Sequence, residues 1–151
     1  AYYPDYGSYV SLDHVLPDGR WLCYDASYEG SVHSDLLLLP PLPPGVQRPV
    51  KPLSRWGGQR RRGEAAALWQ RTGERFHSFI VAGDVLVAAG HQGLDREHAS
   101  FLAAIDISNG SDVWRHALPG PVVKAGTAVN GNGQVFVALE NGRLLALAGA
   151  N

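Results

Sequence analysis

Short apolar runs separated by turn-forming residues fill the C-terminal third of the chain. The runs cover residues 122–129, 134–140 and 143–147. An Asn-Gly-Asn-Gly segment at residues 130–133 joins the first two runs, and Asn-Gly at residues 141–142 joins the last two. Asn-Gly accepts the positive φ angles of the tight turns that connect twisted antiparallel strands. The pattern therefore predicts an antiparallel meander.

The middle third repeats this plan. Apolar runs at residues 79–82, 85–89 and 101–107 are followed by an Asn-Gly turn at residues 109–110 and a fourth run at residues 112–115. Four short apolar runs joined by such turns predict a four-stranded antiparallel unit.

The first third is a weaker copy of the same unit. Strands are predicted at residues 9–16, 20–24 and 36–39, and Pro-Asp-Gly at residues 17–19 predicts the turn between the first two. The place of a fourth strand is less plain, because residues 64–71 are good helix formers by intrinsic propensity.

Two tryptophans mark the length of the repeat. Trp69 and Trp114 are 45 residues apart, and Leu68-Trp69 matches Val113-Trp114. This spacing is typical of a propeller blade built from four short strands. We therefore expect a strand at Leu68-Trp69. A helical turn before it is the alternative that helix propensity favours.

The length of the chain bears on how many blades it holds. At 45 residues a blade, 151 residues make about 3.4 blades, and closed propellers use ~4–8. The sequence predicts an all-β chain of about three four-stranded blades in an incomplete ring. We expect either a fragment of a longer chain or a subunit that completes its ring with partners.

A known repeat resembles the second unit. Residues 104–114 read Ala-Ile-Asp-Ile-Ser-Asn-Gly-Ser-Asp-Val-Trp. They resemble the A-x-D-x-x-T-G-x-x-x-W signature of pyrroloquinoline-quinone-type, or quinoprotein-like, propeller repeats, with Asn109 in place of the Thr. The resemblance covers residues 66–148 well and residues 8–40 loosely. The residues that match as structural blade positions are Ala104, Asp106, Gly110, Trp114 and Trp69.

Structural roles are expected for four of these residues. Trp69 and Trp114 are expected to be buried between neighbouring blades, because a Trp side chain buries a large area. Gly110 is expected to allow the close approach of the indole. Asp106 is expected to cap the turn that follows it.

The stretch at residues 40–63 breaks the repeat. It is rich in proline and arginine, with a polyproline-like segment at residues 40–44 and three consecutive arginines at residues 60–62. We interpret it as an exposed insertion without regular strands. Its arginines could bind phosphate or an acidic partner, but the chain as a whole shows no basic excess.

The composition of the chain argues against several classes of protein. With 13 Lys and Arg against 14 Asp and Glu, the net charge is −1, which argues against bulk attraction to nucleic acid. The single cysteine, Cys23, excludes an internal disulfide framework and Cys-based zinc, iron–sulfur and c-type haem sites. No apolar run approaches the ~18 residues of a membrane-spanning helix.

No residues are predicted to be catalytic, cofactor-binding or metal-binding. The resemblance implies that quinone binding needs a vicinal cysteine pair, which this chain lacks. His91, Asp95, Glu97 and His98 could hold a metal, but they match no known ligand spacing and we interpret them as a solvated loop. Neither a G-x-S-x-G elbow nor a phosphate-binding G-x-x-x-x-G-K-[ST] loop is present.

The sequence therefore predicts a non-catalytic propeller segment that serves as a binding or scaffolding surface in a larger periplasmic or extracellular protein. Its expected partner is another protein or the remainder of the same propeller. The alternative is a segment of a quinoprotein dehydrogenase, or of another propeller enzyme, whose active residues lie outside this chain. Fold resemblance alone does not decide between the two, because one scaffold hosts several functions.

Overall fold

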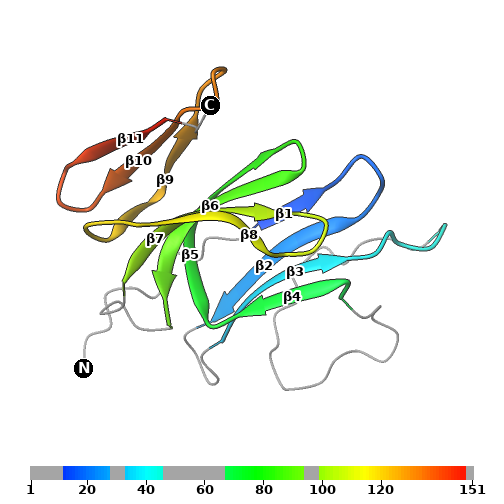
Figure 1. Cartoon of the computed structure of the whole chain (residues 1–151). Helices are drawn as coiled ribbons and strands as arrows, with labels where there is room; N and C mark the ends of the chain where they lie inside the picture. The colour runs from blue at the N-terminus through cyan, green and yellow to red at the C-terminus, as the bar shows by residue number, and fades with distance from the viewer. Residues whose placement is uncertain (1–11, 28–32, 46–66, 94–98, 149–151) are drawn as a thin grey trace.

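The computed structural model of the chain describes residues 12–27, 33–45, 67–93 and 99–148, and the account that follows concerns these residues. They form three antiparallel sheets of four, four and three strands and contain no helix (Figure 1). Within this part of the chain there is accordingly no helix that could cross a membrane.

Each sheet is a meander in which strands that follow one another in sequence lie side by side. The first sheet contains β1 (Leu12–Val15), β2 (Trp21–Ser27), β3 (His33–Leu39) and β4 (Trp69–Thr72). The second contains β5 (Glu74–Ala82), β6 (Val85–Gln92), β7 (Ser100–Asp106) and β8 (Asp112–Ala117). The third contains β9 (Val122–Val129), β10 (Val135–Leu139) and β11 (Leu144–Leu147).

The second sheet is covered on both faces, which explains why β6 and β7 are apolar almost throughout. Successive side chains of a strand point to opposite faces of the sheet. Leu86 and Ala88 lie in the apolar cluster shared with the first sheet, whereas Val87 and Ala89 lie in the cluster shared with the third. A strand buried on both faces has no polar face to display, so its sequence loses the usual alternation.

The predicted all-β architecture is confirmed. Three blade-like antiparallel sheets follow one another along the chain, and the arrangement is consistent with a partial propeller (Figure 1). The proposed helical turn before Trp69 falls partly outside the described residues, and β4 begins at Trp69 itself, so Leu68 precedes the strand.

Several strands are longer than the sequence predicts. Strand β5 begins at Glu74 rather than residue 79, and β3 begins at His33 rather than residue 36. The added positions are mainly polar, but they pair in the ladder all the same, as Arg75 does with His91. Apolar periodicity does not detect such residues, because backbone pairing extends beyond the apolar part of the strand.

Only the first part of the predicted insertion is described. Residues 40–45 form no strand and are mostly exposed, as expected. Residues 46–63, which include the arginine-rich part, lie outside the described residues.

The pairing registers show that the second and third sheets repeat the same positions. Leu102 and Ala104 of β7 correspond to Leu144 and Ala146 of β11, because each pair faces equivalent residues of the preceding strand. Those facing residues are Ala89 and Val87 in β6, and Ala138 and Phe136 in β10. Equivalence of position does not bring equivalence of burial: Leu102 is fully buried, whereas Leu144 is 69% exposed.

The equivalent leucines provide a matched test of this packing. Leu102→Ala removes a fully buried side chain and should lower the free energy of unfolding by about 2–5 kcal/mol. Leu144→Ala should change it by less than about 0.5 kcal/mol, because exposed substitutions remove few contacts. Guanidinium unfolding midpoints of both variants measure the difference, and equal losses would contradict the packing of the third sheet on the second.

Candidate functional site

Three of the residues singled out by the sequence, Trp69, Asp106 and Gly110, lie where the first sheet meets the second. Trp69, in the outer strand β4 of the first sheet, packs on Gly110 in the turn between β7 and β8. A Cβ atom placed on Gly110 would lie 2.7 Å from Cδ2 of Trp69, closer than any real contact allows. The indole Nε1–H donates a 2.8 Å hydrogen bond to the carbonyl oxygen of Ile107.

Gly110 is required for a second reason. Its φ is +75°, in the left-handed region that side chains with a Cβ adopt only at a cost. The backbone N–H of Gly110 donates to the carbonyl oxygen of Asp106 at 2.8 Å, which closes the turn. The turn therefore presents bare backbone to the indole.

Two side chains hold this turn in shape. One carboxylate oxygen of Asp106 accepts a 2.7 Å hydrogen bond from the backbone N–H of Ser108. The amide oxygen of Asn109 accepts from the backbone N–H and the hydroxyl of Ser111, at 2.8 and 2.6 Å. Hydrogen bonds from Ser108, and further ones from Asn109, lower the pKa of Asp106. Asn109 thus performs a turn-closing task at the position where the signature has Thr.

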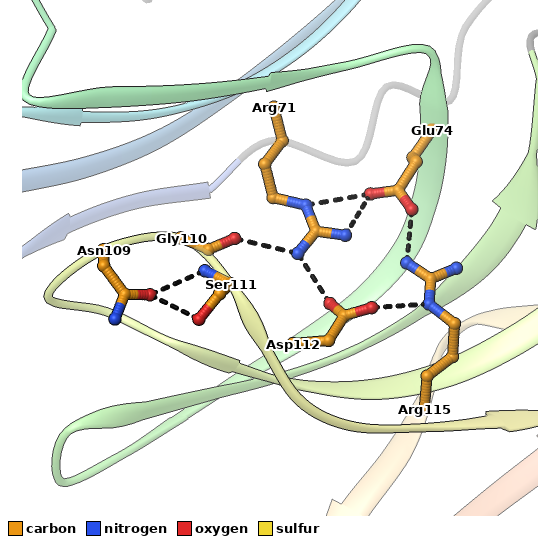
Figure 2. Close-up of polar contacts among 7 residues, drawn as sticks. All are labelled: Arg71, Glu74, Asn109, Gly110, Ser111, Asp112 and Arg115. Atoms are coloured by element: carbon orange, nitrogen blue, oxygen red, sulfur yellow. Dashed lines mark hydrogen bonds and ion pairs between the residues drawn. The ribbon is translucent and has the colours of Figure 1, made fainter.

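Four charged side chains beside the turn form a closed ring of alternating sign (Figure 2). Arg71 of β4 bonds Glu74 at 2.7 Å and Asp112 at 2.6 Å. Arg115 of β8 bonds Asp112 at 2.7 Å and also bonds Glu74. Arg71 additionally donates to the carbonyl oxygen of Gly110 at 2.9 Å. The ring joins the outer strand of the first sheet to two strands of the second.

Partial burial and hydrogen bonding act in opposite directions on this ring. Burial works to raise the pKa of Asp112, but the hydrogen bonds from Arg71 and Arg115 outweigh it, so the pKa is lowered. Burial likewise disfavours the charge of Arg115, but its bonds to Asp112 and Glu74 raise the pKa. The Arg115 guanidinium also lies 3.9 Å from the centroid of the Phe101 ring, a favourable cation–π distance.

A buried hydrogen-bond relay links the same two sheets nearer the core. The hydroxyl of Ser34 donates to the carbonyl oxygen of Glu74, which can only accept. Because that bond uses the one hydroxyl proton of Ser34, Tyr24 must be the donor in the 2.9 Å Tyr24–Ser34 bond. The Tyr24 oxygen in turn accepts from the backbone N–H of Phe76 at 3.1 Å. Burial raises the pKa of Tyr24, so the hydroxyl keeps its proton at neutral pH.

The structure brings together some of the predicted residues and separates others. Trp69, Asp106 and Gly110 meet at the junction of the first two sheets. Trp114 lies instead on the side of the third sheet, opposite Ala104 in the ladder. It packs against the apolar cluster that the second and third sheets share. Both tryptophans are partly buried, whereas the sequence predicts that they are buried. Each lies on the outer strand of its sheet.

The histidine-containing stretch differs from its interpretation as a solvated loop in one respect. His91 belongs to β6 and is buried, and the centroid of its ring lies 5.1 Å from that of His77. Asp95, Glu97 and His98 lie outside the described residues. In the residues that the structure describes, no group of three or more His, Cys, Asp or Glu side chains could hold a metal.

The charge ring and the relay were not identified from the sequence. Arg71 and Arg115 each follow the repeated tryptophan closely, but a repeat alone gives no sign that their partners converge. Glu74 begins β5, whose start the apolar pattern missed. Tyr24 and Ser34 come from two strands of another sheet, and only the docked arrangement brings them to Phe76.

The charged and polar groups at this junction bond to one another across the two sheets, apart from Nη1 of Arg115, which is buried without a hydrogen-bond partner among the described residues. The geometry is that of a joint between sheets. The Trp69–Gly110 contact sets the distance between the first two sheets. The charge ring and the hydrogen-bond relay set the register of one sheet on the other. Neither a protein-family model nor a curated protein matches the chain. The likeness to quinoprotein-type repeats therefore depends on the residues described above.

Substituting two glycines of similar φ separates the two requirements at Gly110. Gly133 has φ +76° and no atom within 4 Å of an added Cβ, so Gly133→Ala should cost only the conformational strain, about 1 kcal/mol. Gly110→Ala adds a clash with Trp69 and should cost about 3 kcal/mol in total. Thermal or denaturant unfolding measures both, and similar losses would show that the indole is not held against the turn.

The lowered pKa of Asp112 predicts a pH dependence. A carboxylate with a depressed pKa stabilises the fold above its unfolded value near 3.8, and that contribution is lost as pH falls through the folded pKa. At pH 7 we expect Asp112→Asn to cost about 1 kcal/mol, and the gap from wild type to close at lower pH. Asp18→Asn, at an exposed pair with Arg20, is the control with a smaller gap. A gap that stays constant down to pH 2 would contradict the ring.

Proposed function

We propose that this chain is a non-catalytic segment of a quinoprotein-like β-propeller that serves as a binding or scaffolding surface within a larger periplasmic or extracellular protein. Three features support the proposal: three consecutive antiparallel meanders, a Trp–Gly contact between the first two sheets, and the resemblance of residues 104–114 to the blade signature. The expected partner is another protein or the remainder of the propeller.

One observation carries the proposal, which is the outward face of the third sheet. On the inward face of this sheet, Val135, Val137 and Leu139 belong to the apolar cluster that the second and third sheets share. Because side chains alternate, the intervening residues point away from that cluster. They are apolar too, and include the exposed Leu144 and Ala146. The face consists of Ala128, Phe136, Ala138, Leu144 and Ala146.

The pairing registers show what such a face does in the other two sheets. The equivalent positions of the first sheet are Leu22, Tyr24, Leu36 and Leu38, and they are buried against the second sheet. The equivalent positions of the second sheet are Val87, Ala89, Leu102 and Ala104, which are buried on the side of the third. This face is covered by a neighbouring sheet in the first and second sheets, and in the third sheet it is equally apolar but mostly exposed. It is therefore suited to binding a further protein surface.

A charge placed on this face tests the proposal. The isolated chain should bind an apolar dye such as ANS and self-associate as its concentration rises, because an open apolar face is an association hazard. Leu144→Glu should reduce both dye binding and self-association severalfold without lowering the free energy of unfolding. Val113→Glu introduces the same charge at an exposed valine of β8 and should leave both unchanged.

Dye binding, analytical ultracentrifugation and unfolding midpoints provide the three measurements. A wild-type chain that stays monomeric at high concentration and binds no dye would refute the proposed surface. Equal effects of the two substitutions would show that net charge, and not this face, governs association.

A further inference from the structure

We propose that Asn132, in the turn that joins β9 to β10, is a site of spontaneous deamidation, in which water converts its side-chain amide to a carboxylate. The chain contains four Asn-Gly pairs, at residues 109–110, 130–131, 132–133 and 141–142, and each lies in a connection between two strands. The hydrogen bonds of the structure distinguish Asn132 from the other three asparagines. The inference concerns the chemistry of the chain itself and does not depend on the proposed function.

Deamidation at an Asn-Gly pair begins when the main-chain nitrogen of the glycine gives its proton to water or hydroxide and attacks Cγ of the asparagine. The N–Cγ bond forms, the Cγ–Nδ2 bond breaks, and Nδ2 takes up a proton and leaves as ammonia, so that a five-membered cyclic imide remains. One water molecule then opens the imide at either carbonyl and yields aspartate or isoaspartate. Glycine favours ring closure because it has no Cβ to restrict the backbone.

Ring closure requires the side-chain amide to turn toward the main chain, so hydrogen bonds that hold the amide slow the reaction. The amide oxygen of Asn109 accepts from the backbone N–H and the hydroxyl of Ser111, at 2.8 and 2.6 Å. The amide oxygen of Asn141 accepts from the backbone N–H of Arg143 at 3.1 Å. Both amides must give up these bonds before they can react.

Asn130 is held more firmly still, although it lies in the same turn as Asn132. Its amide oxygen accepts from the backbone N–H groups of Asn132 and Gln134, both at 3.0 Å. Its Nδ2 donates to Oε1 of Gln134 at 2.7 Å, and the residue is half-buried. Three bonds therefore oppose the rotation that ring closure needs.

Asn132 has none of these restraints. It is exposed, and its side-chain amide makes no hydrogen bond to any part of the chain that the structure describes. A Cβ atom built on Gly131 or Gly133, the residues on either side, would have no other atom within 4 Å. The amide is thus free to rotate, and water has open access to it.

The main-chain nitrogens favour a different asparagine. The N–H groups of Gly110, Gly133 and Gly142 each donate to a main-chain carbonyl oxygen, at 2.8, 3.0 and 3.0 Å. Within the described residues the N–H of Gly131 makes no such bond. If the nitrogen decided the rate, Asn130 would react first. If the side-chain amide decides it, Asn132 reacts first, and the two asparagines of one turn therefore provide the test.

The experiment follows each asparagine in the same sample. The 151-residue chain is incubated at mildly alkaline pH, and its proteolytic peptides are sequenced by tandem mass spectrometry at intervals. We expect Asn132 to deamidate first, Asn141 about fivefold more slowly, and Asn109 and Asn130 about tenfold more slowly or less, because each bond reduces the population that can react. Anion exchange should resolve the product, whose net charge is one unit more negative than −1.

Two controls show whether hydrogen bonding sets the order. In guanidinium chloride the four rates should converge, since the unfolded chain keeps the Asn-Gly pairs and loses the bonds. In the folded chain, Ser111→Ala should raise the rate at Asn109 alone and Gln134→Ala the rate at Asn130 alone, each by about threefold. A variant that only destabilised the fold would raise all four rates together.

Three outcomes would overturn the inference. Fastest reaction at Asn130 would show that the unbonded nitrogen of Gly131 decides the rate. Equal rates at the four asparagines of the folded chain would show that the hydrogen bonds offer no protection. The same order of rates in the unfolded chain would assign the preference to the neighbouring sequence. None of these results bears on dye binding or self-association, which test the proposed function separately.

Discussion

The contact between Trp69 and Gly110 sets the spacing on which the junction of the first two sheets depends. The indole lies where a side chain on residue 110 would otherwise be, so the two sheets approach as closely as backbone and ring allow. At that spacing the guanidinium of Arg71 reaches the carbonyl of Gly110 and the carboxylate of Asp112. A larger separation would break these bonds together, because each is at hydrogen-bond length already.

Polar and apolar contacts have different roles at this junction. Apolar burial provides the main stabilisation, since it scales with the area removed from water. It is non-directional, however, and would tolerate small slips of one sheet over the other. The hydrogen bonds of Tyr24, Ser34 and the charge ring are directional, so they select one register among several that bury similar area.

The sequence predicted the architecture well because its signals are local. Asn-Gly turns, short apolar runs and the spacing of Trp69 and Trp114 each report on neighbouring residues or on the repeat. The predicted role of Gly110 depended on a resemblance, and the geometry supplies its physical basis. The charge ring was not predicted, since Arg71 and Asp112 meet only after two sheets dock. The start of β5 was missed for a related reason: Arg75 and Ser78 are polar yet buried, and only their tertiary surroundings explain it.

The Tyr24–Ser34 relay has a consequence for how the chain folds. Strand β5 forms one edge of the second sheet, and the relay provides partners for the N–H of Phe76 and the carbonyl of Glu74 on that strand. Separating the first sheet from the second without water entering would leave both groups unsatisfied, at a cost of several kcal/mol, roughly 1–3 for each. Partial opening is therefore disfavoured, and we expect the first eight strands to fold as a single cooperative unit rather than as two independent ones.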